Sequence, residues 1–210
     1  MKELFKLACV VTVSCWAANT LGQGTSFSAD MVQTATGESA ERMKQLAAQT
    51  GKPVPTTFTW KVYRSGTKMR IDMSSGPQQG SAITDLSGGG KSYMLQHREK
   101  TYFEYDSVKK GQELEETLQY LKAGGDLCQL RTKYPSCRKL AAEVVVGRSC
   151  QGYEVATEHG DKETLCVDDR LRFPIREVKK SGTMEIRNIV ESAQPAGLFE
   201  IPSGYTKAGK

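Results

Sequence analysis

The stretch "TTFTWKVYRSGTKMRIDMSSG", residues 56–76, contains two runs in which apolar and polar side chains alternate. Alternation with a period of two is the pattern of a strand that buries one face. Ser65 and Gly66 lie between the runs, at a position that suits a tight turn. The stretch therefore predicts two antiparallel strands that share one apolar face. The apolar positions of the two runs are Phe58, Trp60, Val62, Met69, Ile71 and Met73.

The same alternation recurs along the rest of the chain. Phe27, Ala29 and Met31 alternate with polar residues near the start. Further runs of this kind occupy residues 81–86, 91–96, 101–106, 150–157, 162–169, 172–180 and 182–190. Roughly ten short strands at near-regular spacing predict a mainly β protein with a large antiparallel sheet, sandwich or barrel.

Helical patterns are few and fall between the strands. One helix is predicted from Ser39 to Lys52, and a second contains Leu114, Leu118 and Leu121 at the spacing of one helix face. The segment 126–144 is expected to form a short helix, a break at its proline and a second turn. We expect the apolar sides of these helices to cover the open or concave face of the sheet.

The first residues have the layout of an export signal. Two lysines precede an apolar run from Leu7 to Ala18, which is too short to cross a bilayer. We interpret residues 1–22 as a signal peptide, cleaved somewhere between residues 18 and 24, and residues 23–210 as one domain. In a second interpretation, "TVSC" directs a lipid to Cys15. Both interpretations predict export across the inner membrane, with the periplasm as the expected location.

Four of the six cysteines lie beyond this signal: Cys128, Cys137, Cys150 and Cys166. Because exported proteins meet an oxidising compartment, disulfides are expected, and three connectivities are possible. A bridge between Cys128 and Cys137 is preferred because it closes a short loop. The C-x-x-C-like pairs of a zinc site are absent, so no metal is expected.

A bridge between Cys150 and Cys166 meets a difficulty of register. A hairpin centred near Gly160 would place Cys150 opposite Arg170 and Cys166 opposite Glu154. The two sulfur atoms would then be too far apart to bond. This bridge therefore requires a bulge or a different turn.

The charge balance gives little support for a nucleic-acid partner. The chain has 29 basic and 24 acidic residues, which gives a net charge of +5. Nucleic-acid binding proteins usually gather their basic residues in a stripe, whereas these are spread along the chain. We expect no nucleic-acid partner, and association with an envelope surface is compatible with the mild positive charge.

The segment "DLSGGGKSYML", residues 85–95, resembles the end of a phosphate-binding loop. That motif needs a glycine where this chain has Asp85, and it needs a helix after Ser92. Here a strand, a turn and another strand follow, so Gly88–Gly90 are interpreted as a hairpin loop that contains Lys91. No nucleotide or other cofactor is expected.

No arrangement of residues predicts catalysis. His97 and His159 both fall in predicted turns, and "GRSCQG", residues 147–152, has one residue too many for a nucleophile elbow. Oxidation would silence a thiol at Cys150. Several carboxylates are scattered as on a solvated sheet face: Asp85, Glu104, Asp168 and Asp169. The chain is therefore interpreted as a non-enzyme.

Several segments resemble a known family. They are "KVYRSGTKMRIDM", "SYML" with "KTYFEY", "VVVGRSCQGYEV" and "LFEIPSGY". They are similar to an exported bacterial family of unknown function, DUF4412, itself distantly similar to the LolA/LolB lipoprotein carriers. The resemblance implies an incomplete antiparallel β-barrel, or strongly curved sheet, with a helical lid and an apolar cavity that receives acyl chains in the carriers. It transfers no catalytic residue, and the helix from Ser39 and the cysteine-rich segment depart from the compact carriers.

These observations favour an envelope protein that binds an apolar moiety, such as a lipid or a lipoprotein acyl chain. A ligand-free structural or interaction module is the alternative, and an exported enzyme is the third candidate. No oligomeric state is predicted. The predicted cavity residues are Phe58, Trp60, Val62, Met69, Ile71, Met73, Tyr93, Leu95, Leu114, Leu118 and Leu121.

Overall fold

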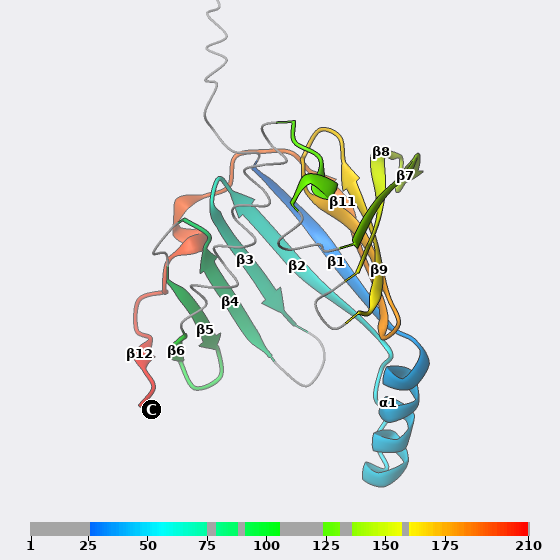
Figure 1. Ribbon diagram of the computed structural model, residues 1–210. Coiled ribbons are helices and arrows are strands. Elements are labelled where there is room, and N and C mark those ends of the chain that lie inside the picture. Colours follow the sequence, from blue (N-terminus) through cyan, green and yellow to red (C-terminus); the bar gives the residue numbers. More distant parts are fainter. Residues whose placement is uncertain are drawn as a thin grey trace, which may run out of the picture.

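The computed structural model describes residues 26–74, 79–87, 91–105, 124–130, 136–156 and 160–209. Its strands are β1 (Phe27–Ala35), β2 (Thr57–Ser65), β3 (Lys68–Met73), β4 (Gly80–Asp85), β5 (Ser92–Gln96), β6 (Thr101–Tyr105), β7 (Ser136–Val145), β8 (Arg148–Ala156), β9 (Lys162–Asp168), β10 (Pro174–Lys179), β11 (Gly182–Val190) and β12 (Thr206–Lys207). One α-helix, α1 (Gly37–Thr50), and two 3₁₀ turns, η1 (Leu127–Gln129) and η2 (Ala196–Phe199), complete the described elements (Figure 1). No helix in the described ranges is long and apolar enough to span a bilayer.

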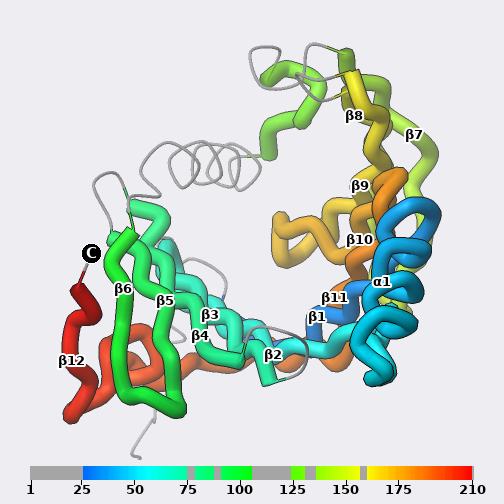
Figure 2. The backbone as a smooth tube through the Cα atoms, turned by 90° about the horizontal axis from the view of Figure 1, so that it is seen from below, coloured from blue at the N-terminus to red at the C-terminus, as the bar shows by residue number. Residues whose placement is uncertain are grey.

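All twelve strands belong to one sheet. Its order is β12-β6-β5-β4-β3-β2-β1-β11-β10-β9-β8-β7, so β1 and β11 join two antiparallel meanders. The two-residue strand β12 pairs with β6 in parallel, and every other neighbouring pair is antiparallel. Figure 2 shows this sheet as an open curl with β6 and β7 on opposite arms. The predicted fold class is confirmed: the protein is mainly β, with a strongly curved sheet that does not close into a barrel.

One segment was predicted as helical turns and is a strand. Residues 136–145 form β7, which pairs with β8 along its length around a bulge between Lys139 and Ala142. Leu140 and Ala141 favour a helix locally, but pairing with a neighbouring strand outweighs so weak a preference. The short helix predicted beside Cys128 is present as η1.

Helix α1 does not cover the sheet as predicted. It begins two residues before Ser39 and ends at Thr50, and the next residue, Gly51, has a φ of 65°, the left-handed conformation that suits glycine. None of its residues is buried, Leu46 is 48% exposed, and Figure 1 shows the helix extending past the end of the strands. The second predicted helix, with Leu114, Leu118 and Leu121, lies outside the described residues.

Both predicted cysteine pairs are at bonding distance. The sulfur atoms are 2.06 Å apart in Cys128–Cys137 and 2.00 Å apart in Cys150–Cys166. The register of β8 with β9 differs from the predicted one, so Cys150 pairs with Asp168 and Cys166 pairs with Gly152. The cysteines of the second pair are thus diagonal neighbours, with Cα atoms 5.5 Å apart, and no bulge is needed.

Candidate functional site

One row of side chains crosses six strands on the same face of the sheet. Successive cross-strand partners are Ala29, Val62, Ile71, Ala82, Met94 and Phe103. Exposure increases along this row: Val62 is fully buried, Ile71 and Met94 are half-buried, and Phe103 is 39% exposed. The row therefore leads from the core to an accessible apolar surface.

This row lies on the inside of the curl. Figure 2 shows the connection between β9 and β10 reaching into the curl, and that connection carries Leu171 and Phe173. The Phe173 ring packs edge-on against Phe27, with centroids 5.4 Å apart, and the buried Arg64 guanidinium lies 5.3 Å from its centre. Arg64 and Val62 are two residues apart on β2, so they are on the same face, and the row that contains Val62 faces into the curl. We call this side of the sheet the inner face.

The chain's own residues fill one end of the inner face. Val62 belongs to the buried cluster that contains Phe27, Leu171 and Phe173, and it has no exposed surface. Val62 is therefore part of the core, whereas the sequence places it in the ligand cavity. The difference arises because Leu171 and Phe173 come from a connection whose position no strand pattern predicts.

The rest of the inner face gathers most of the predicted cavity residues. Trp60, Met69 and Ile71 are half-buried against the core cluster, and Phe58 and Met73 keep 8% and 7% of their surface exposed. The structure adds residues that sequence reasoning missed. On β1 and β11 these are Met31, which pairs with Trp60, and Met184, which shares the cross-strand partner Gln33 with Phe58. On β5 and β6 they are Met94, Phe103 and Tyr105.

Tyr93 and Leu95 lie on the opposite face, which is a correction to the predicted cavity. Tyr93 pairs with Ile83, and Leu95 packs with Ile83 and Phe199 without any exposed surface. The β5 residue on the inner face is Met94. The sequence shows that alternate residues share a face, but it takes the register with β4 to decide which set faces inward.

The opposite face of the sheet, which we call the outer face, is packed on strands β2 to β6 against residues 195–207, the C-terminal strap. Arg70 and Ser81 anchor it: Arg70 Nη1 donates to the Leu198 carbonyl (3.0 Å), and Ser81 Oγ is 2.7 Å from His97 Nε2. His97 Nδ1 in turn lies 2.6 Å from the hydroxyl of Tyr205. The strap is thus held by polar contacts as well as by apolar packing.

The Ser81–His97 pair does not form a catalytic dyad. Ser81 is fully buried, and its only proton is donated to Asp72 Oδ1 at 2.5 Å. His97 Nε2 is then the donor to Ser81, and in the neutral ring Nδ1 accepts from the Tyr205 hydroxyl. His97 lies in a turn as predicted, and its ring fastens the strap instead of activating a nucleophile.

The lysine of the partial phosphate motif is engaged with a strand. Lys91 Nζ lies 3.0 Å from Glu104 Oε1, and Ser92 begins β5. Asp85 accepts from the Thr67 hydroxyl at 3.1 Å. Gly88–Gly90 lie outside the described residues, but a strand after Lys91 excludes the helix start that phosphate binding requires.

A buried carboxylate holds the connection between β9 and β10 in place. Asp168 accepts from Arg148 Nε at 2.5 Å and from the backbone N–H groups of Arg170 and Leu171. Burial alone would raise the pKa of Asp168, but these hydrogen bonds outweigh it and keep the pKa below its ordinary value. The carboxylate is therefore ionised and positions Leu171 within the inner core.

One group of potential metal ligands is already occupied. The Glu143 carboxylate and the sulfurs of Cys150 and Cys166 lie within 4.8 Å of one another. The two sulfurs are bonded to each other, and Glu143 pairs with Arg176. This group therefore offers no ligand set for a cation.

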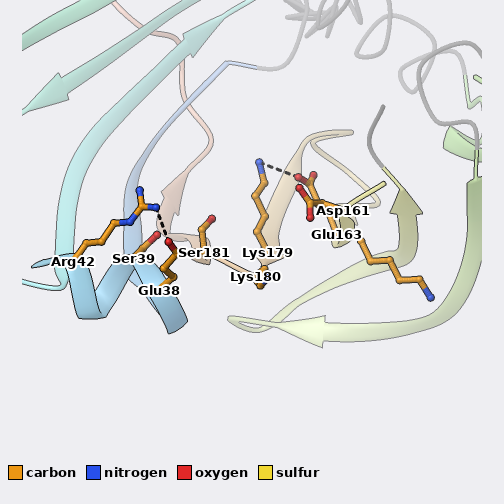
Figure 3. A pocket seen from close by; sticks show the side chains of 9 residues that line it. Glu38, Ser39, Arg42, Asp161, Glu163, Lys179, Lys180 and Ser181 are labelled. Carbon is orange, nitrogen blue, oxygen red and sulfur yellow. Dashed lines mark hydrogen bonds and ion pairs between the residues drawn. The ribbon is translucent and has the colours of Figure 1, made fainter. Parts of the chain in front are cut away.

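Two adjoining hollows lie where the inner face meets α1. The inner hollow, of about 260 Å³, is bounded by Phe58, Met184 and Met43 together with polar residues of β1, β10 and β11. The outer hollow, of about 360 Å³, is shown in Figure 3. Its lining is mostly charged: Glu38, Ser39, Arg42, Asp161, Lys162, Glu163, Lys179, Lys180 and Ser181.

No protein-family model and no curated protein sequence matches the chain. Among solved structures, an uncharacterised conserved protein from Thermus thermophilus has a TM-score of 0.54 at 7% identity, covering 88% of this chain and 90% of that one. PNGF-II has a TM-score of 0.51 at 6% identity, covering 89% of this chain and 32% of that one. A LolA superfamily protein from Nitrosomonas europaea has a TM-score of 0.38 at 8% identity, covering 84% and 90%. At these identities the first two comparisons concern the fold alone, and membership of DUF4412 stays a prediction.

Proposed function

We propose that this is an exported cell-envelope protein that binds an apolar moiety, such as a lipid or a lipoprotein acyl chain, on its inner face without catalysing a reaction. The observation that carries the proposal is the row from Val62 to Phe103. Its members are apolar and share one face, and those beyond the core are half-buried or exposed.

Contact of this apolar surface with water is unfavourable in free energy. Covering it would stabilise the complex by about 25 cal/mol for each Å² of apolar surface removed from water. The half-buried Met69 and Met94 suit a surface that adapts to flexible acyl chains, because thioether side chains change conformation easily. An adaptable apolar surface fits an acyl chain better than a rigid, polar ligand.

Export is supported by two observations. The apolar run from Leu7 to Ala18 has the form of a signal peptide. The cysteine pairs Cys128–Cys137 and Cys150–Cys166 are placed for disulfides, which persist in oxidising compartments. A periplasmic protein would meet both lipids and lipoproteins.

Lipid extraction from protein purified out of its native envelope tests the proposal. Mass spectrometry of the organic extract should detect a co-purifying lipid or acylated species above the level of an unrelated exported protein. Ile71→Glu should abolish this enrichment because it places a charge in the centre of the inner face. Val178→Glu is the matched control, since Val178 is an apolar β10 residue that is 38% exposed and lies outside the row.

A ligand-free interaction module is the second candidate. It is favoured by β7, the last strand of the sheet, where Val144 is 72% exposed. An extract without lipid enrichment would overturn the binding proposal and favour this candidate.

A further inference from the structure

The two hollows beside α1 form one groove that opens from the inner face. They share Ser39, Lys179 and Ser181, so they adjoin directly. The inner hollow contains Phe58 and Met184, and both are cross-strand partners of Gln33 on β1. The groove is therefore continuous with the surface to which we assign the acyl chain.

The polarity of the groove's lining changes along its length. Phe58, Met43 and Met184 bound its inner part together with two charged residues, Glu177 and Lys179, whereas four basic and three acidic side chains line its outer part. At about 260 Å³ the inner hollow is smaller than most ligand pockets, which span roughly 300–1,000 Å³. It has room for the junction of a longer molecule whose two ends differ in polarity.

The charges in the outer hollow are interleaved. Lys179 Nζ lies 3.5 Å from Glu163 Oε1, and Arg42 pairs with Glu38 on α1 (Figure 3). Lys179 Nζ also lies 2.9 Å from Oε1 of Glu177, which lines the inner hollow. Burial alone would lower the pKa of Lys179, but the hydrogen bond to Glu177 and the nearby carboxylate charges outweigh it and raise that pKa. The outer hollow therefore presents both signs of charge side by side.

We infer that the ligand is an amphiphile with a zwitterionic head group, bearing both an ammonium and a phosphate, and that this head lies in the outer hollow. This inference rests on the proposed function, because the acyl chain must occupy the inner face. A purely anionic head would compete for Arg42 and Lys179 with their partners Glu38 and Glu163, and it would supply no cation in their place. A zwitterionic head meets the acidic groups with its ammonium and the basic groups, such as Arg42, with its phosphate.

Four single-chain lipids with the same acyl chain test the head group. They carry phosphoethanolamine, phosphoglycerol, a free carboxylate or uncharged glycerol, and their binding is followed by the fluorescence of Trp60, the only tryptophan in residues 23–210. The phosphoethanolamine lipid should bind about two- to fivefold more tightly than the others, the effect expected of a few exposed ion pairs.

Two variants locate the head in the groove. Glu163→Gln should remove most of the preference for phosphoethanolamine over phosphoglycerol, and Arg42→Gln should weaken both phospholipids but not the glycerol lipid. Glu154→Gln is the control, because Glu154 lies on the same hairpin but on the opposite face of the sheet. Circular dichroism of each variant checks the fold.

Equal affinity for all four lipids, or an unchanged preference in both groove variants, would overturn the head-group inference and leave the proposed function intact. No response of Trp60 to any of the lipids would contradict both. The two failures are therefore distinguishable.

Discussion

The two faces of strands β2 to β6 differ in whether another part of the chain covers them. On the outer face, the C-terminal strap packs Phe199 against Ile83 and Leu95, and a chain of hydrogen bonds ties Tyr205 to the sheet through His97. On the inner face of the same strands, apolar residues from Ile71 to Phe103 stay partly exposed.

This difference distinguishes the residues that stabilise the fold from those that are exposed to a ligand. Alternate residues of one strand have similar composition, yet one set is buried by another part of the same chain. Leu95 has no exposed surface, whereas its neighbour Met94 is half-buried. We therefore assign the outer set to folding and the inner set to ligand contact.

The largest expected effect comes from truncating this pair of neighbours. Leu95→Ala should lower the free energy of unfolding by about 2–5 kcal/mol, because it opens a cavity under the strap. Met94→Ala should cost less than about 1.5 kcal/mol, since a half-buried side chain loses less on truncation. Urea unfolding of the two variants measures both values. Equal losses would contradict the assignment of the faces.

A smaller effect concerns the end of the strap. Hydrogen bonds from Lys207 and Lys91 outweigh the slight desolvation of Glu104 and hold its pKa below the ordinary 4.5. Because the folded pKa is lowered, the contribution of this carboxylate is present above pH 4.5 and is lost as the pH falls through the folded value. An NMR titration of Glu104 should show a midpoint below 4.5, and Lys207→Gln should move it upward. A midpoint that does not respond to this substitution would show that β12 is not held by this contact.

Much of the fold follows from local pattern. The alternation in residues 56–76 predicts β2 and β3, and similar runs predict most of the other strands. Residues 136–145 are not predicted as a strand, because Leu140 and Ala141 favour a helix locally and it is the pairing with β8 that makes this segment a strand. Helix propensity is a small local term, and tertiary pairing overrides it.

The candidate site was less predictable than the fold. Phe58, Trp60 and Ile71 share a face because alternation within a strand and one tight turn determine their relation. Assigning Leu95 or Val62 to a face or to the core requires contacts with Phe199 and Phe173, which are more than 100 residues away in the chain. Such long-range contacts leave no periodic signal in the sequence.

The charged groove beside α1 was also missed. Its residues come from α1, from the start of β9 and the residue before it, and from the end of β10 and the turn after it, so no single stretch contains the pattern. Met43 falls in the helix predicted from Ser39 to Lys52, but its position beside Phe58 depends on how α1 leaves the sheet. Sequence periodicity describes each element and not the angle between two of them.

Quenching by brominated acyl chains tests the central claim most directly. Trp60 lies on the inner face, and a Tyr93→Trp, Trp60→Phe double variant places the same reporter on the outer face. We predict that a brominated single-chain lipid quenches Trp60 in a saturable manner and leaves the tryptophan at position 93 unquenched. Quenching of both reporters alike, or of neither, would contradict an acyl-binding inner face.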